Sequence, residues 1–466
     1  MALSLPRRLT TGAVAASMAL TLAACTGGDS PGDGQSNQAT SSAPGPEALA
    51  AADGVVEVTF WHSFGGAAGE ALDSLITDFN AENDGIIKVE AAYQGSYTDM
   101  LAKYAASLRD NSNPTVIIAG DTTSGYLRAV EHSQSPAAMA AANPDDLDLS
   151  ELREAAANYY SADGELFAVP MAASTPIVWV NPTILEQAGV DPDVSLESIT
   201  DVYNVAKQVT ENTDAAGLVL HYDGWWFEQP TAMAGGDYCT PGNGRGAEGD
   251  ATALSLTSDA QVAAFSELSK IYLDGYGLDV GSDYAAAMSA FGGGQAAMLL
   301  FSSGAAGTII ESGVEFDTRA FPSFGSEQGG TVVGGNALWL SSTAQDAEKV
   351  AGWKLISYLA SAPAQETFSQ ATGYVAINSL VDDSPTQQAY LEEHPYAGVF
   401  ADQLDSSPAT TATAGCLSGA MTGIREAVVP QMQAIFTGNV SLEDGLAAAE
   451  SDANQAIEDY LAQAGE

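Results

Sequence analysis

The feature that most constrains the fold is an alternation of strand-like and helix-like segments that begins at residue 55. Residues 55–60 form a short apolar run rich in Val, and apolar residues from 68 to 79 recur at helical spacing. The same two patterns follow at 86–92 and 97–108, before another apolar run at 116–119. Strands that alternate with helices pair in parallel, because each helix returns the chain to the same edge. We therefore predict an α/β fold with parallel-type sheets flanked by helices.

The alternation resumes in the second half of the chain. A helix is predicted at 258–273, with Ser258 as its N-cap, and a buried strand at 296–301. Further helices are predicted at 348–359, 364–369, 425–436 and 442–462, with breaks at Pro363 and Gly438 and a kink at Pro430. With 466 residues the chain is long enough for two α/β lobes, between which it crosses more than once.

The N-terminus has the pattern of a secretory signal. Arg7 and Arg8 precede a short apolar run at 13–22, and Leu-Ala-Ala follows immediately before Cys25. This ending resembles the bacterial lipoprotein signal, in which Cys25 becomes the first mature residue and carries lipid. We predict a signal peptide over 1–24 and an anchor with a flexible tether over 25–54, which is rich in Gly, Ser, Pro and Ala. The alternative is a simple secretory signal with an incidental Cys.

Charge narrows the class of partner. The chain has 60 acidic residues against 14 Lys and Arg, a formal net charge of −46. Such a surface repels nucleic acid and anionic lipid, so nucleic-acid binding is not expected. Cys239 and Cys416 remain after the signal, and in an oxidising compartment we predict that they form a disulfide. The alternative is two buried free thiols.

The sequence shows no motif of catalysis or of metal binding. His62, His132, His221 and His394 are isolated, with no second ligand at zinc spacing. There is no nucleophile elbow, phosphate-binding loop or dinucleotide fingerprint, and the glycine cluster at 242–246 is interpreted as a turn. We expect no metal and no cofactor, although spacing alone does not exclude a pair of catalytic carboxylates.

From about 55 to 460 the sequence resembles the extracellular solute-binding proteins of ABC importers, and within them those that bind glycerol-3-phosphate. The motifs that carry the resemblance lie at 58–63, 79–83, 93–97, 173–176, 294–298, 302–304, 334–339 and 372–374. It implies a two-lobed periplasmic-binding-protein-like fold of type II with hinge crossovers. The expected N-terminal lobe is 55–171 plus 305–361, and the C-terminal lobe is 172–304 plus 362–466. Crossings are predicted near 170–176, 301–304 and 360–364.

The resemblance also implies a set of ligand contacts. They are Tyr97, Asp121, Ser174, Tyr222, Trp225, Ser302, Gly335, Tyr374 and Arg425. Hydroxyls, a closely approaching backbone N–H and one fixed cation suit a phosphate, and a carboxylate suits a glycerol hydroxyl. Two positions depart from the family pattern on the glycerol side: Asp121 replaces a Glu, and Tyr222 replaces the first of two Trp, while Trp225 matches the second. Extra room there suits a diester headgroup such as choline next to aromatic faces; core packing or a sugar-stacking platform is the alternative.

Arg425 stands out even without the resemblance. It is the only basic residue from 355 to 466, against fifteen acidic ones, and it follows a small-residue stretch at 419–423. We predict that it neutralises a captured anion. The alternative is an ion pair with Glu426 or another acid of its helix, which is worth about 0–1 kcal/mol at a surface.

The function implied is capture of a solute. We expect a monomeric lipoprotein on the outer face of the cell membrane that binds sn-glycerol-3-phosphate, or a glycerophosphodiester such as glycerophosphocholine, and delivers it to the transmembrane subunits of an ABC permease. Two alternatives stay open: a binding protein for a sugar or oligosaccharide, and an extracytoplasmic hydrolase.

Overall fold

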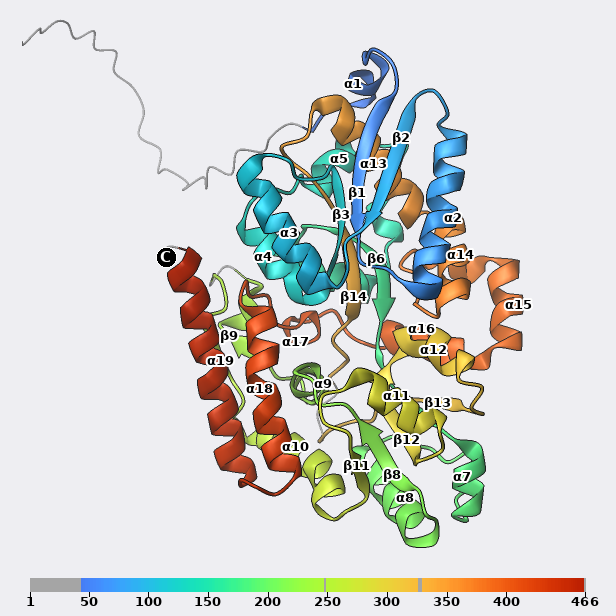
Figure 1. The fold of residues 1–466 in the computed structure, drawn as a ribbon, viewed down its shortest axis with the longest axis vertical. Helices are drawn as coiled ribbons and strands as arrows, with labels where there is room; N and C mark the ends of the chain where they lie inside the picture. The colour runs from blue at the N-terminus through green and yellow to red at the C-terminus, as the bar shows by residue number, and fades with distance from the viewer. Residues whose placement is uncertain (1–42, 247–248, 326–328, 465–466) are drawn as a thin grey trace, which may run out of the picture. The chain divides into compact units, whose positions relative to one another are not determined.

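Two five-stranded sheets organise the chain in the computed structural model, which describes residues 43–246, 249–325 and 329–464 (Figure 1). The first sheet has the order β2 (Ile87–Tyr93), β1 (Val56–His62), β3 (Val116–Gly120), β14 (Gly334–Leu340), β6 (Val169–Ser174). The second has the order β11 (Gly277–Asp279), β8 (Ala216–Leu220), β12 (Ala296–Ser302), β7 (Pro176–Val180), β13 (Asp317–Ala320). Two short ribbons pair β4 (Ser161–Ala162) with β5 (Glu165–Leu166), and β9 (Cys239–Thr240) with β10 (Ala253–Leu254).

Both sheets are built on the same plan. In the first, β1 runs parallel to β2 and β3, and β14 runs antiparallel to both β3 and β6. In the second, β8 runs parallel to β11 and β12, and β7 runs antiparallel to both β12 and β13. Four strands of each sheet therefore share one direction and one strand opposes them. The prediction of parallel-type α/β sheets is confirmed, with this one reversed strand in each.

Local sequence signals explain where the elements of the first sheet lie. Buried and exposed residues alternate along β1, as expected for a strand with one covered face, whereas β3 is buried throughout. α3 (Tyr97–Asp110) begins where Ser96 and Asp99 form a capping box, in which the Ser96 hydroxyl accepts from the Asp99 N–H. The cap fixes Tyr97 as the first residue of the helix.

Helices cover the sheets. In the first half of the chain they are α2 (Gly66–Glu82), α4 (Ser124–Ala129), α5 (Pro136–Ala142), α6 (Glu154–Tyr159), α7 (Pro182–Gln187), α8 (Ile199–Asn212) and α9 (Trp225–Met233). In the second half they are α10 (Asp259–Leu273), α11 (Tyr284–Gly292), α12 (Ala306–Glu311), α13 (Asp346–Ala360), α14 (Ala362–Thr372), α15 (Pro385–Glu393), α16 (Pro395–Asp405), α17 (Thr411–Ala414), α18 (Met421–Phe436) and α19 (Leu442–Ala464). Short 3-10 turns are η1 (Asp121–Thr123), η2 (Leu149–Glu151), η3 (Gly242–Gly244), η4 (Ser303–Ala305) and η5 (Ser379–Asp383). α13 contacts β1, β14 and β6, and α8 contacts β8 and β12.

The chain passes between the sheets at two clear points. Thr175 alone separates β6 in the first sheet from β7 in the second, which confirms the crossing predicted near 170–176. The return runs through the segment between β13 and β14. The crossing predicted at 301–304 is wrong, because β12 is followed by β13 in the same sheet. β13 also lies outside the lobe to which we assigned 305–361.

The C-terminal part corrects the third predicted crossing. α14 packs against α2, a helix that covers the first sheet, so the chain has not left that sheet's surroundings at 360–364. α18 and α19 then pack side by side against α10, at the second sheet (Figure 1). α18 continues through Pro430, and Gly438 follows its end with a positive φ of 70°. The lobe boundaries as a whole stay a prediction.

The N-terminal end of the described chain corrects the extent of the tether. α1 (Pro46–Ala50) packs on α13, and the Asn143 side-chain amide donates to the Pro44 carbonyl at 3.1 Å. Residues 44–50, which we assigned to the flexible tether 25–54, are therefore docked on the folded part. The predicted signal peptide over 1–24, Cys25 and the tether up to residue 42 lie outside the described residues.

The predicted disulfide can be compared directly with the structure. Cys239 and Cys416 form a disulfide, as predicted, across 177 residues of sequence. Among the helices in the described ranges, none has the length and apolarity that a membrane crossing requires.

Candidate functional site

A buried cation joins elements that belong to the two sheets. Arg425 lies one turn into α18, and its side chain is 14% exposed. Its Nε donates to Glu228 Oε1 at 2.7 Å, and its Nη2 donates to Asp121 Oδ2 at 3.2 Å. Asp121 begins η1, directly after strand β3 of the first sheet, whereas Glu228 lies on α9. We call Asp121, Arg425 and Glu228 the charge triad.

The triad corrects the alternative given for Arg425. The side chain is buried and pairs across the fold, so the alternative of a surface pair with Glu426 is wrong. Two carboxylates contact the guanidinium. Burial lowers the pKa of Arg425, but Glu228 and Asp121 raise it by more, so the guanidinium stays charged.

Glu228 is the most buried member of the triad, with 1% of its side chain exposed. Burial raises the pKa of its carboxyl to about 7, although the Arg425 guanidinium opposes the shift. Its second oxygen, Oε2, is buried without a hydrogen-bond partner in the described part of the chain. Sequence reasoning missed Glu228. The available signal was its spacing: it stands three residues after Trp225, which places both on one helix face.

Tyr97 lies beside the triad. A Cβ at Gly120, the residue before Asp121, would lie 3.0 Å from the Tyr97 ring, so this ring packs on the Gly120 backbone. The Tyr97 hydroxyl accepts from the Asn336 amide at 3.0 Å. Burial raises the pKa of Tyr97, and raises that of Tyr374 to about 12. Both phenols therefore stay protonated at neutral pH and can donate a hydrogen bond.

The predicted serines lie against glycine backbones. A Cβ at Gly334 would lie 2.8 Å from Ser174 Oγ and 3.3 Å from the Trp225 ring, which puts this hydroxyl and this indole at one backbone position. A Cβ at Gly304 would lie 3.0 Å from the Tyr374 ring and 3.4 Å from Ser302 Oγ. Tyr374 in turn is within electrostatic range of Tyr97 and Asp121.

Gly335 shows why this position excludes other residues. Its φ is +125°, and a Cβ there would lie 2.0 Å from the Ala172 carbonyl oxygen. Gly335 pairs with Ala173 in the β14–β6 ladder, directly before Ser174. The strand ladder thus brings Gly335 and Ser174 together.

Eight of the nine predicted contacts converge in this way, and one does not. The converging residues are Tyr97, Asp121, Ser174, Trp225, Ser302, Gly335, Tyr374 and Arg425. Tyr222 instead packs its ring into the core of the second sheet's region, against Tyr272 and Phe436. The role of the eight converging residues as ligand contacts stays a prediction. The position of Tyr222 weighs against such a role for that residue.

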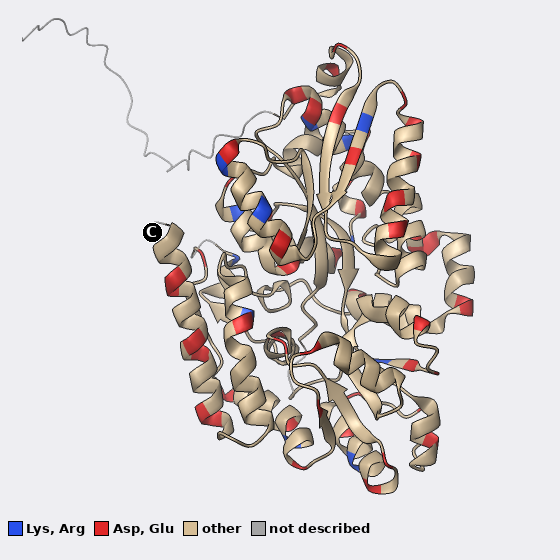
Figure 2. Ribbon diagram, in the orientation of Figure 1, with Lys and Arg blue, Asp and Glu red and all other residues tan. Residues whose placement is uncertain are grey.

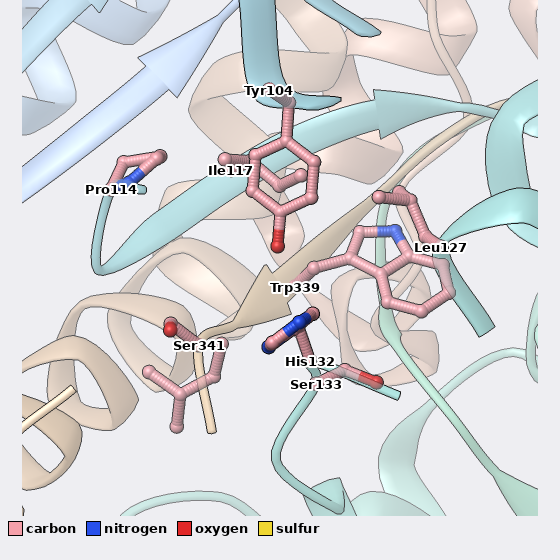
Figure 3. A pocket seen from close by; sticks show the side chains of 9 residues that line it. Tyr104, Pro114, Ile117, Leu127, His132, Ser133, Trp339 and Ser341 are labelled. Carbon is pink, nitrogen blue, oxygen red and sulfur yellow. The ribbon is translucent and has the colours of Figure 1, made fainter. Parts of the chain in front are cut away.

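A separate pocket lies on the first sheet. Figure 3 shows Tyr104 of α3, Trp339 of β14 and His132 around it. None of the predicted ligand contacts is among its lining residues. Within the described ranges no group of three or more His, Cys, Asp or Glu side chains is arranged to hold a metal ion.

Comparison with known proteins identifies relatives over most of the chain. A family model described as bacterial extracellular solute-binding protein matches residues 74–393. The sn-glycerol-3-phosphate-binding periplasmic protein UgpB of Rhizobium meliloti is 25% identical over 411 residues, which cover 87% of this chain and 95% of that protein. UgpB of Escherichia coli K12 is 25% identical over 414 residues, covering 87% and 93%.

Solved structures share the fold. UgpB from Mycobacterium tuberculosis, in complex with glycerophosphocholine, superposes with a TM-score of 0.73 at 20% identity, covering 87% of this chain and 99% of that one. The cyclic α-maltosyl-1,6-maltose binding protein from Arthrobacter globiformis superposes with a TM-score of 0.72 at 19% identity, with coverage of 87% and 99%. The same architecture therefore serves proteins with different solutes.

Proposed function

This chain belongs to the bacterial extracellular solute-binding proteins and is thus a solute-binding protein of an ABC importer, and we propose that its solute is a glycerophosphate. The solute is sn-glycerol-3-phosphate or a glycerophosphodiester such as glycerophosphocholine. Relatives of this family bind substrates and are not enzymes. The proposal concerns which solute this chain takes and which residues take it.

One observation carries the proposal: the buried Arg425 binds Asp121, and Asp121 lies within electrostatic range of the Tyr97 and Tyr374 hydroxyls. A phosphate group accepts several hydrogen bonds, and its best partner is a guanidinium with a fixed orientation. Tyr97 and Tyr374 supply phenol donors, and Ser174 and Ser302 supply hydroxyls. Relatives that match 87–88% of this chain are named sn-glycerol-3-phosphate-binding periplasmic proteins, which supports the same solute class.

We propose that residues from the regions of both sheets contact the solute. Asp121 and Gly335 belong to strand ends of the first sheet, whereas Trp225 and Arg425 lie on helices near the second. A solute that contacts both groups stabilises the arrangement in which they are close, and that arrangement is what a permease recognises. Delivery to the permease subunits, a monomeric state and anchoring through lipid on Cys25 complete the proposal.

A neutral sugar is the second candidate, and the triad itself favours it. Two carboxylates surround one guanidinium, and Glu228 Oε2 is an acceptor with no partner among the described residues. Sugar hydroxyls are donors that such carboxylates accept, and Trp225 offers a face on which a sugar ring stacks.

Calorimetric titration separates the candidates. The purified protein is titrated with sn-glycerol-3-phosphate, glycerophosphocholine and maltose, and the solution is then assayed for free choline to detect hydrolysis. We expect binding of at least one glycerophosphate and release of no choline. Binding of maltose alone contradicts the proposal.

Arg425→Gln tests the residue that carries the proposal. Loss of one partner from a buried charged hydrogen bond costs about 2–5 kcal/mol, so we expect glycerophosphate affinity to fall about 30-fold or more. Arg319→Gln is the matched control, because Arg319 is a largely buried arginine that binds Asp317 and the Pro192 carbonyl away from the triad. Tyr374→Phe, which removes one hydroxyl only, keeps the test decisive if the arginine variant unfolds. Unchanged affinity in both site variants contradicts the assignment.

A further inference from the structure

Glu228 is linked to Arg425 through both its side chain and its helix. The carboxyl accepts from Arg425 Nε at 2.7 Å. At the start of the same helix, a Cβ at Gly224 would lie 2.6 Å from Arg425 Cα and 2.7 Å from its Cβ, so the backbone of this turn touches the arginine directly. The start of α9 therefore packs directly against Arg425, and the hydrogen bond to Glu228 fixes the orientation of the guanidinium.

The charge balance of the triad is unfavourable for an anion. With all three groups ionised, one guanidinium faces two carboxylates, and a captured phosphate adds a further negative charge beside them. In a largely dry site this repulsion is weakly screened. Protonation of one carboxyl relieves it, and the group that costs least to protonate is the one already least solvated.

Glu228 meets that condition. Its side chain is 1% exposed, against 15% for Asp121 and 41% for Asp223. Burial raises its pKa to about 7, and Asp121 and Asp223 act in the same direction against Arg425. The charged and titratable groups within electrostatic range of Glu228 are Asp121, Tyr159, Asp223, Tyr238, Arg245 and Arg425. Its Oε2 is buried and has no hydrogen-bond partner among the described residues.

We propose that Glu228 is a positioning residue of the solute site, which orients Arg425 through Oε1 and takes up a proton from bulk solvent on Oε2 when an anionic solute is captured. The inference rests on the proposed function, because it requires that the solute is an anion. It adds a residue that the family resemblance did not supply and a chemical step, proton uptake, that accompanies binding.

The experiment measures affinity against pH. Calorimetry with sn-glycerol-3-phosphate is run from pH 6 to pH 8 on the wild type, Glu228→Gln, Glu228→Ala and Asp223→Asn. A bound anion raises the pKa of Glu228 above the value of about 7 that it has without solute. Binding is therefore strongest below pH 7 and weakens as the pH rises, by about tenfold between pH 6 and pH 8. The solute's own phosphate ionises at about pH 6 and contributes equally in every variant.

Glu228→Gln isolates the proton. The amide does not titrate but keeps an oxygen that accepts from Arg425 Nε, so we expect affinity like that of the wild type at pH 6 and no additional weakening at pH 8. Titrations in buffers of different ionisation enthalpy show proton uptake in the wild type and less in this variant. Asp223→Asn is the matched control: it removes a nearby carboxylate charge and keeps the oxygen that caps Trp225 N–H. Because Asp223 helps to raise the pKa of Glu228, this variant should keep a pH dependence whose midpoint lies at lower pH than in the wild type, whereas Glu228→Gln should lose the dependence.

Glu228→Ala isolates positioning. It removes the acceptor, so affinity falls at every pH, by about tenfold or more, whereas Glu228→Gln rescues it. Equal affinity of Glu228→Ala and the wild type, or an equal pH slope in Glu228→Gln and the wild type, overturns the inference. If the wild type binds the glycerophosphate but neither variant differs from it, only Glu228 was misassigned. If the wild type binds neither sn-glycerol-3-phosphate nor glycerophosphocholine, the proposed function fails and the inference fails with it.

Discussion

Arg425 shows how far a single residue can be interpreted before its neighbours are known. Its isolation among acids predicts a cation that neutralises a captured anion, and in the structure the side chain is buried and paired with two carboxylates. The small residues before it allow another group to come close. A Cβ at Gly419 would lie 2.1 Å from the Tyr460 ring, so this glycine admits a side chain of α19.

The residue-scale prediction concerns Gly335. Its φ of +125° is rarely adopted by residues with a side chain, and a Cβ would collide with the Ala172 carbonyl. We expect Gly335→Ala to lower the free energy of unfolding by about 1–3 kcal/mol, measured by urea denaturation, and to weaken solute binding because β14 shifts against β6.

Gly398→Ala is the control for Gly335→Ala. A Cβ there has no atom within 4 Å and the residue lies inside α16, so alanine should stabilise the protein by about 0.5–1 kcal/mol. If both variants shift the denaturation midpoint in the same direction, the account of Gly335 is wrong.

At the scale of elements, local patterns predicted most of the long helices and four strands of the two sheets, β1, β2, β3 and β12. The Ser258 cap, for example, forms a capping box with Gln261 at the start of α10. Neither the reversed strand β14 nor the return of β13 to the second sheet was predicted. β14 pairs with β3 and β6, which lie more than 150 residues earlier in the chain. The direction of such a pairing depends on the path of the whole chain rather than on the strand's own residues.

The element-scale prediction concerns the disulfide. It connects β9 to the segment between α17 and α18, just before the helix that carries Arg425. Replacing both Cys239 and Cys416 by Ser should lower the free energy of unfolding by about 2–5 kcal/mol, measured by urea denaturation under non-reducing conditions.

A reductant provides the control for the disulfide. It should lower the stability of the wild type and leave the double variant unchanged, because only the wild type has a bond to reduce. Wild-type protein whose denaturation midpoint does not respond to full reduction, verified by thiol titration, would show that this bond contributes nothing to stability.

At the scale of the whole molecule, negative charge dominates. Figure 2 shows Asp and Glu residues on helices throughout the described fold, with few Lys or Arg. A chain with 60 acidic and 14 basic residues is repelled by anionic lipid, so no electrostatic attraction holds it at a membrane. Retention at the cell surface then depends on the proposed lipid on Cys25.

The whole-molecule prediction follows from that dependence. Cys25→Ala should move the protein from the membrane pellet to the soluble fraction after cell lysis, measured by fractionation and immunoblot. Washing wild-type membranes with 1 M salt is the control and should release nothing, since the attachment is not ionic. A Cys25→Ala protein that stays in the pellet after the same wash contradicts lipid anchoring at this residue.

The sequence by itself determined the α/β class, the secretory pattern and the periods of most of the long helices, because these depend on residues close together along the chain. Only the tertiary structure decided that Glu228 and Asp121 hold Arg425, that Tyr222 belongs to the core and that residues 44–50 dock on the fold. The reason is distance along the chain: Arg425 lies 197 residues from Glu228 and 304 from Asp121. No local sequence pattern shows which distant carboxylate will be buried next to a cation.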